Sequence, residues 1–187
     1  MGLSIHYSGY ILQSDLIKPI TEEVVDICTD LDWKFHVIDD EEINGVVFSP
    51  KKCEPISLTF NRDGRLLSPQ NIVVKDIYDG ERIDKEIIFT TSTKTQYAGM
   101  DAHIAVIKLL RYLSKKYFKH FVLKDEGFYW ESTDEKILKG QFDRYNSALE
   151  FFSETLQNMP DVPDESLESL VQRMERLLRG KLGRTDG

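Results

Sequence analysis

The stretch ISLTFNRDGRLL (residues 56–67) places two apolar runs on either side of a tight turn. Asp63-Gly64 in its middle supplies the positive backbone φ that such a turn needs, so the two runs are predicted to form a hairpin. Short strand-like runs surround it: GVVFS (45–49) precedes it, and NIVVKDIY (71–78) and KEIIFTT (85–91) flank Asp79-Gly80. Strands joined by such short turns pair antiparallel, because a parallel pair needs a longer crossover.

The chain before the hairpin predicts a strand, a helix and a second strand. Residues 3–9 alternate apolar with polar side chains, the two-residue period of a half-buried strand. Residues 14–32 repeat apolar side chains at helical spacing, with Pro19 close to the first turn. In WKFHVID (33–39), Phe35 and Val37 are predicted on one face of a strand and His36 on the other.

The second half of the sequence is predicted to be mainly helical. A broadly apolar segment near 100–118 is expected to lie across the sheet, and HFVLKD (120–125) is a short strand candidate. Ser132 and Glu135 have the spacing of a capping box, and two seamed helices follow, separated by two prolines. The predicted fold class is α+β: an antiparallel or mixed sheet packed against helices, with a C-terminal antiparallel helical hairpin. The predicted divisions are a sheet domain over 1–131, the hairpin packed on it over 132–180, and a flexible tail over 181–187.

The charge is distributed unevenly along the chain. The formal net charge is −8, and the first fifty residues hold ten acidic side chains against Lys18 and Lys34. Such an acidic region repels phosphate backbones, so nucleic acid is not an expected partner, whereas a basic protein surface is. No apolar run is long enough to cross a bilayer and no cationic leader opens the chain, so a cytoplasmic protein without a membrane partner is expected.

The sequence lacks the common catalytic motifs. It has no G-x-S-x-G, no GxxxxGK[ST], no GxGxxG and no HExxH, so no catalytic residue, metal ligand or cofactor is assigned. The two cysteines, Cys28 and Cys53, form no CxxC pair and fit a reducing compartment. Cys28 is expected in the core, and Cys53 beside two lysines is a loop residue whose reactivity stays open.

The pattern suggests two candidate ligand sites. If the strands around His6 and His36 were neighbours, the two imidazoles and the Tyr10 hydroxyl would converge on one polar sheet face. The alternative is two unrelated surface histidines.

The second is the hydroxyl-rich loop before the central helix, with Thr93, Lys94 and Thr95, which could hold a small anion near a helix N-terminus. The alternative there is a threonine-rich strand end running into a capped helix.

The aromatic run DEGFYWESTDE (125–135) is interpreted as a core anchor. In an extended strand Phe128 and Trp130 share one face and are predicted to be buried together. Tyr129 and Glu131 would then lie on the opposite face, as part of a shallow polar pocket.

The expected function is a soluble intracellular protein-interaction or regulatory module without catalytic activity, whose partner is another protein or a second copy of the chain. The alternative is a small enzyme or ligand-binding domain that uses the polar sheet face or the loop around Lys94. These patterns do not choose between an enzyme and a binding protein.

Overall fold

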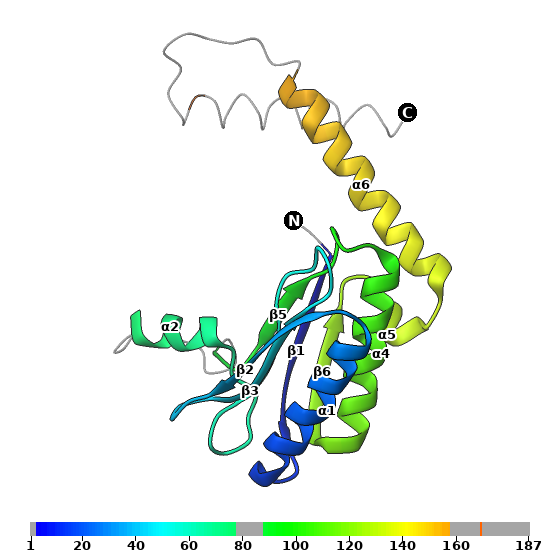
Figure 1. The fold of residues 1–187 in the computed structure, drawn as a ribbon. Coiled ribbons are helices and arrows are strands. Elements are labelled where there is room, and N and C mark those ends of the chain that lie inside the picture. The colour runs from blue at the N-terminus through cyan, green and yellow to red at the C-terminus, as the bar shows by residue number, and fades with distance from the viewer. Residues whose placement is uncertain (1–2, 78–87, 158–168, 170–187) are drawn as a thin grey trace. The chain divides into compact units, whose positions relative to one another are not determined.

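The computed structural model describes residues 3–77, 88–157 and 169. The elements in chain order are β1 (Ser4–Ile11), the 3-10 helix η1 (Ser14–Leu16), α1 (Ile17–Asp30), β2 (Lys34–Asp39), β3 (Asn44–Ser49), β4 (Ile56–Phe60), α2 (Pro69–Ile77), β5 (Thr91–Lys94), α4 (Met100–Tyr117), β6 (Phe118–Asp125), α5 (Tyr129–Ser132) and α6 (Glu135–Gln157) (Figure 1). The contacts divide the chain into Met1–Phe142 and Asp143–Gly187, so the division falls within α6.

The strands form two antiparallel sheets, as the turn-rich sequence predicts. One sheet has the order β5-β1-β6 and the other has the order β2-β3-β4. In the first sheet Tyr7 lies opposite Thr91 on one side and Leu123 on the other. In the second sheet Val46 lies opposite Val37 and Leu58. The α+β class is therefore confirmed, with β1 and β3 as the central strands.

The predicted turn at Asp63-Gly64 joins the two sheets. Gly64 has φ +75°, a conformation that favours glycine, and its N–H donates to the Asn61 carbonyl at 2.9 Å. Beyond the turn the chain runs beside β1: the Leu66 N–H donates to Gly9 O at 2.9 Å, and the Ile11 N–H donates to Gly64 O at 3.0 Å. The hairpin thus places Arg65 next to the end of β1.

The core lies between the sheets and helices α1 and α4 (Figure 1). Helix α1 packs against β2 and β3, and α4 packs against β6. The fully buried apolar side chains include Ile5, Ile20, Val24, Val46, Leu58, Val106, Ile107 and Leu113. In β1 the alternation is confirmed: Ile5 and Tyr7 are buried, whereas His6, Ser8 and Tyr10 are more exposed and lie on the other face.

Residues 71–78 were predicted as a strand, and this is wrong for the residues described, because α2 covers Pro69–Ile77. The helix begins with a side-chain cap: the Asn71 N–H donates to Ser68 Oγ at 3.2 Å. Pro69 occupies the first helical position, where its missing N–H costs nothing. This start signal outweighs the strand preference of the β-branched residues that follow. Residues 78–87, with the predicted Asp79-Gly80 turn, lie outside the described residues.

The chain leaves β6 differently from the extended strand predicted for residues 125–131. The Asp125 carboxylate accepts the backbone N–H groups of Gly127 (2.7 Å), Tyr129 (2.7 Å) and Trp130 (3.0 Å), and this bends the chain into α5. Phe128 takes a left-handed φ of 58° in the bend. As a result Phe128 is 52% exposed and Tyr129 only 5% exposed, the reverse of the predicted burial, while Trp130 is half-buried.

Helix α6 begins two residues later than the predicted capping box suggests. Its start is capped by Asp134, whose Oδ1 accepts the Lys136 N–H at 2.7 Å, rather than by Ser132. Leu138 and Phe142 are buried in the core of Met1–Phe142, so the first turns of α6 belong to that unit. The predicted second helix of the hairpin, apart from residue 169, and the tail lie outside the described residues. No helix in the described ranges combines the length and the apolarity that spanning a bilayer requires.

Candidate functional site

The structure separates the residues of the predicted two-histidine site. His6 and Tyr10 both lie on β1, but His36 lies on β2, which belongs to the other sheet. The strands of the two histidines are therefore not neighbours, and their convergence on one patch is wrong. Strand order depends on long-range pairing, which no local pattern in this chain encodes.

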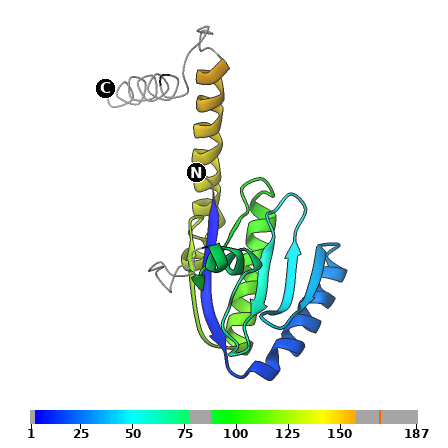
Figure 2. The same ribbon diagram turned by 90° about the vertical axis from the view of Figure 1, so that its left-hand side faces the viewer.

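His6 and Tyr10 instead share a face with three residues of β6. The register pairs His6 with Lys124, Ser8 with Val122, and Tyr10 with His120. Helix α4 packs against β6 on the opposite face of this sheet (Figures 1 and 2). Val122 is 52% exposed and Tyr10 is 40% exposed, so this face of the sheet, which we call the open face, meets solvent.

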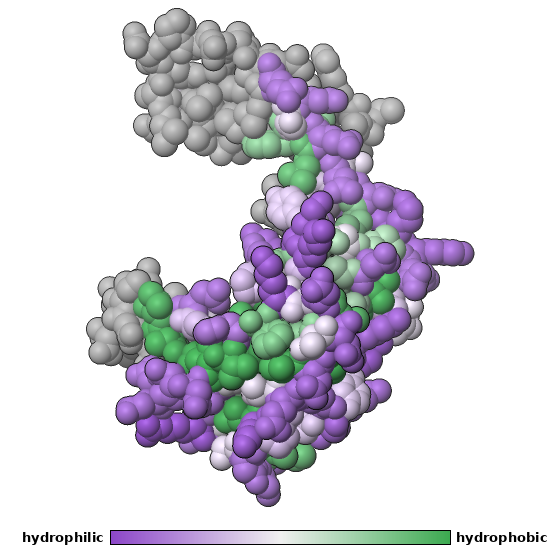
Figure 3. Space-filling model, viewed as in Figure 1, coloured by the Kyte–Doolittle hydropathy of each residue, from purple (hydrophilic) through white to green (hydrophobic). Residues whose placement is uncertain are grey.

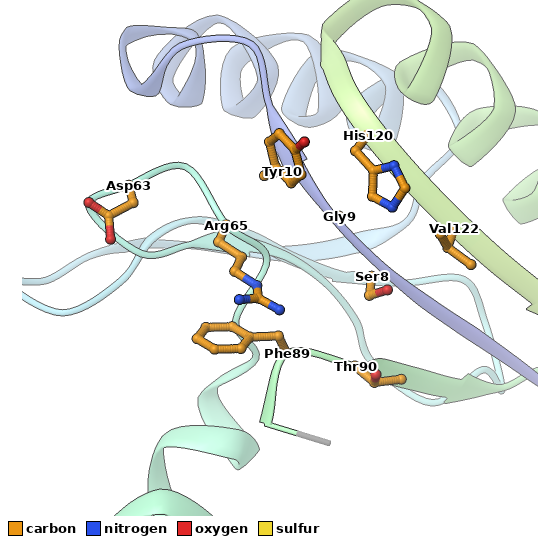
Figure 4. Close-up of a pocket in the computed structure, with 9 residues that line it drawn as sticks. All are labelled: Ser8, Gly9, Tyr10, Asp63, Arg65, Phe89, Thr90, His120 and Val122. Atoms are coloured by element: carbon orange, nitrogen blue, oxygen red, sulfur yellow. The ribbon is translucent and has the colours of Figure 1, made fainter. Parts of the chain in front are cut away.

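A cleft of about 560 Å³ opens at one end of the open face (Figure 4). Its walls come from four parts of the chain: β1, the turn after β4, the residues before β5, and β6. The lining residues are Ser8, Gly9, Tyr10, Asp63, Arg65, Phe89, Thr90, His120 and Val122. The rings of Tyr10 and His120 stack, with centroids 5.6 Å apart and 28° between their planes.

The positive charge in this cleft comes from Arg65. Its guanidinium carbon lies 3.7 Å from the centroid of the Phe89 ring, so the flat cation covers the ring face (Figure 4). Among the described residues no carboxylate forms an ion pair with Arg65. A guanidinium held by its face keeps its N–H edge available for an anion.

A smaller neighbouring cleft extends the open face toward the start of β1. It shares Ser8, Thr90 and Val122 with the first cleft and adds His6, Tyr7 and Lys124 to its lining. His6 Nε2 lies 3.6 Å from Glu126 Oε1, and the other oxygen of Glu126 accepts the Ser4 N–H at 2.8 Å. The open face thus combines aromatic rings and imidazoles with the cations Arg65 and Lys124. The acids Asp63 and Glu126 lie at its two ends.

A second groove, of about 720 Å³, lies between α1 and the β2–β3 hairpin. Strand β2 is the outer strand of its sheet, as Figure 2 shows beside α1. Phe35 is 42% exposed and Val37 is 45% exposed, although both face the same way as the buried Phe48 and Val46 opposite them. The groove residues are Ser14, Asp15, Ile17, Lys18, Thr21, Glu22, Val25, Val37, Ile38, Asp39, Asn44 and Gly45.

The hydroxyl-rich loop predicted as an anion site is occupied by the chain's own groups. The Thr93 hydroxyl donates to the Glu54 carbonyl at 3.1 Å, and the Lys94 N–H donates to Glu54 Oε2 at 3.1 Å. Lys94 Nζ is also 4.0 Å from Glu54 Oε1. Thr93 and Thr95 are buried, so these two hydroxyls hold the loop together rather than face a ligand.

Thr95 belongs to a buried network that the sequence did not reveal. Its Oγ lies 2.7 Å from His103 Nδ1, and His103 Nε2 lies 3.1 Å from Asp125 Oδ1, at an angle rather than in a straight hydrogen bond. The residue types resemble a hydroxyl–imidazole–carboxylate triad. However, Thr95 and His103 are 0% exposed and neither lines any cleft described above, so no substrate could reach the hydroxyl.

The Asp125 carboxylate is ionised within this network. Burial opposes its ionisation, but His103 and the N–H groups of Trp130 and Gly127 outweigh burial and hold the pKa of the carboxyl below its ordinary value. The network therefore ties the end of β5, α4, β6 and α5 together. Its only signal in the sequence is a single histidine within an apolar helix, which more often marks the core than a site.

The remaining candidate residues form no site. Tyr129 is buried, and its carbonyl accepts a hydrogen bond from Arg111 at 3.3 Å, whereas Glu131 is exposed. The predicted polar pocket of Tyr129 and Glu131 is therefore wrong. Burial raises the pKa of the Cys53 thiol to about 11, which disfavours the reactive thiolate. Within the described residues, no group of three or more His, Cys, Asp or Glu side chains could hold a metal ion.

The comparisons with known proteins add no family to these observations: no family model, no curated protein and no solved structure matches this chain.

Proposed function

We propose that this chain is a non-catalytic interaction module that binds a basic, extended segment of another protein along β2. One observation carries the proposal: β2 is an outer strand whose apolar side chains reach solvent beside a groove. Extended segments recognise such edges by adding a strand, so backbone hydrogen bonds supply affinity and alternate side chains supply specificity.

The backbone of β2 has one free side in the described part of the chain. All six of its residues, Lys34–Asp39, pair with β3, and the sheet ends there. An edge of this length offers a row of unpaired N–H and C=O groups. An added strand would form hydrogen bonds with these N–H and C=O groups in place of solvent.

The apolar side chains beside this edge favour a protein partner over a small molecule. Phe35 and Val37 extend the buried face of the sheet past its outer strand, and Ile17 and Val25 of α1 line the same groove. On the face of the molecule seen in Figure 1, Figure 3 shows a band of hydrophobic residues between hydrophilic ones, without assigning it to single side chains. Alternate side chains of an added strand would enter the groove and remove this apolar surface from water.

The charge around the groove selects the chemistry of the partner. Asp15, Glu22 and Asp39 line it, and Lys18, the one cation among its described lining residues, lies 3.9 Å from Glu22. More acids flank it on α1 and after β2, in the region that carries the whole net charge. A partner with lysine or arginine between apolar residues fits both features.

The test is the binding of a fluorescein-labelled peptide of about seven residues in which lysine and valine alternate. Fluorescence anisotropy is expected to rise on adding the protein, and the affinity to fall as salt increases. The matched peptide with glutamate in place of lysine is expected not to bind. Perturbed amide resonances should concentrate in β2 and α1.

Two variants of β2 separate the groove face from the opposite face. Val37→Lys places a charge in the groove and is expected to weaken binding about 10-fold or more, because the valine no longer buries its apolar surface. His36→Lys adds the same side chain on the other face and should change the affinity little. Equal losses in both variants, or no binding of the lysine peptide, would contradict the proposal. Reversible dimerisation blocked by Val37→Lys alone would assign the edge to a second copy instead.

A further inference from the structure

We infer that the cleft on the open face binds a small ligand that carries a flat ring and an anionic group, a phosphate or a carboxylate. This site is independent of the β2 edge, since its residues belong to the other sheet and to the turn that joins the sheets. Three features of the cleft support it: a guanidinium without an ion-pair partner in residues 3–77 and 88–157, a stacked pair of rings, and a volume that suits a small molecule.

The guanidinium of Arg65 provides the anion contact. It is exposed, lies over the Phe89 ring, and has no ion-pair partner among the described residues. Contact with the ring limits the motion of an otherwise flexible side chain, so less entropy is lost when an anion binds. Its planar fork matches two oxygens of a carboxylate or phosphate.

The stacked rings of Tyr10 and His120 provide the surface for a flat ring. They come from neighbouring strands at paired positions, and both are exposed on the open face. Val122 adds an apolar contact, 52% exposed, on the same strand as His120. A planar ligand gains most by covering such a ring, because ring faces are poorly hydrated and stack on one another.

The lining also restricts the number of charges and the size of the ligand. Asp63 at the edge of the cleft repels a second anionic group placed beside it, so a single acidic group directed at Arg65 is favoured (Figure 4). The volume of about 560 Å³ falls within the range of small-molecule sites, roughly 300–1,000 Å³. A nucleic-acid strand is disfavoured by the net charge of −8.

The binding experiment uses probes that separate the ring from the anion. Adenosine 5′-monophosphate and 1-naphthoate each carry both parts, adenosine carries the ring alone, and inorganic phosphate carries the anion alone. Calorimetry and amide chemical shifts are expected to show binding of a two-part probe, with shifts at Tyr10, Arg65 and His120. The part probes should bind at least about 10-fold more weakly, because each forgoes one set of contacts. Preference between the first two probes distinguishes phosphate from carboxylate.

Variants of the lining assign the contacts. Arg65→Gln is expected to weaken binding about 10-fold, the usual loss for a hydrogen bond to a charged group. Tyr10→Leu keeps an apolar side chain but removes the ring, and should weaken binding about 2- to 10-fold. The matched control is Arg62→Gln, which removes another exposed arginine of the same turn, one that does not line this cleft.

The outcomes that overturn the inference are distinct from those that bear on β2. Absence of binding by both two-part probes to the folded wild-type protein would exclude this ligand class. Equal losses in Arg65→Gln and Arg62→Gln would mean that the probes respond to general positive charge rather than to the cleft. Retained binding of the lysine–valine peptide by Arg65→Gln, with unchanged thermal unfolding, would show that the variant is folded and that the two sites are separate.

Discussion

Two carboxylates in this chain collect similar numbers of donors in very different surroundings. Asp125 accepts three backbone N–H groups and faces His103 inside the core, where it is 3% exposed. Glu23 on α1 accepts the hydroxyl of Tyr112 (2.6 Å), the ammonium of Lys116 (2.7 Å) and the hydroxyl of Tyr117 (2.7 Å), all from α4 at the surface. Both clusters fasten elements that are distant in sequence.

The electrostatic effects on the two groups have the same sign. Burial opposes the ionisation of each, and hydrogen bonds from the neighbours outweigh burial, so the pKa of both Asp125 and Glu23 is lowered. The two clusters differ in what happens to the hydrogen-bond donors when the carboxylate is removed. Water can reach the Glu23 cluster and screens it, whereas N–H groups left behind by Asp125 would stay buried and unpaired. The buried network should therefore contribute far more to stability.

The largest effect is expected from Asp125→Ala. The variant leaves three backbone N–H groups and His103 without their acceptor, so the free energy of unfolding should fall by about 3–5 kcal/mol. Urea unfolding followed by circular dichroism measures this change. The control is Glu131→Ala, an exposed acid of the same segment, which should stay within about 0.5 kcal/mol of the wild type. Similar changes in the free energy of unfolding of both variants would contradict a larger contribution from the buried network.

The pH dependence tests whether the charge of Asp125 carries this stability. Its pKa is lowered in the folded state, so its contribution is present above the unfolded pKa, about 3.9, and is lost as pH falls through the folded pKa. The stability difference between wild type and Asp125→Asn should therefore be largest near neutral pH and shrink as the pH falls below the unfolded pKa. A difference that stays constant over this range would assign the effect to shape rather than charge.

A smaller loss is expected when the space around His103 is reduced. A Cβ at Gly127 would lie 2.6 Å from Leu138 Cδ1 and 2.9 Å from His103 Nε2. Gly127→Ala should thus destabilise by about 1–3 kcal/mol, because the ring and the leucine must move apart in a packed core. The comparison variant Gly140→Ala lies in α6 with nothing within 4 Å of the added methyl, and should stabilise by up to about 1 kcal/mol. Thermal unfolding measures both changes: the midpoint temperature should fall for Gly127→Ala and rise for Gly140→Ala.

The sequence predicted best where the structure depends on local rules. The alternation of Ile5 and Tyr7 with polar residues follows from one buried sheet face, and the turn at Gly64 follows from its positive φ. Both signals lie within a few residues of the feature they specify. The central helix was found for the same reason, since its apolar stripe is continuous.

The predictions failed where a single polar group redirected the chain or where distant segments met. The alternation of residues 125–131 predicted an extended strand. It did not indicate that the Asp125 carboxylate accepts three backbone N–H groups and thereby ends the strand. His103 sits eight residues beyond Thr95, on another element, so only the fold brings them together. The cleft was not predicted: Tyr10 was a candidate, but together with His6 and His36, whereas Arg65 and His120 lie beside it through strand pairing that local patterns do not contain.

The smallest effect is expected from Glu23→Gln, and it sharpens the contrast between surface and core. The amide keeps the shape, but its single oxygen can accept from only one of the Tyr112 and Tyr117 hydroxyls, which donate to different oxygens of the carboxylate, while its NH2 group can donate to the other hydroxyl. The attraction to Lys116 is lost, and an exposed ion pair of this kind contributes little to stability. Because water and ions screen this attraction, the difference from wild type should vanish in about 1 M salt. The effect of Asp125→Ala should persist there, since salt does not reach the buried network. A salt-insensitive loss in Glu23→Gln would show that the α1–α4 contact is shielded and would place the two clusters in the same class.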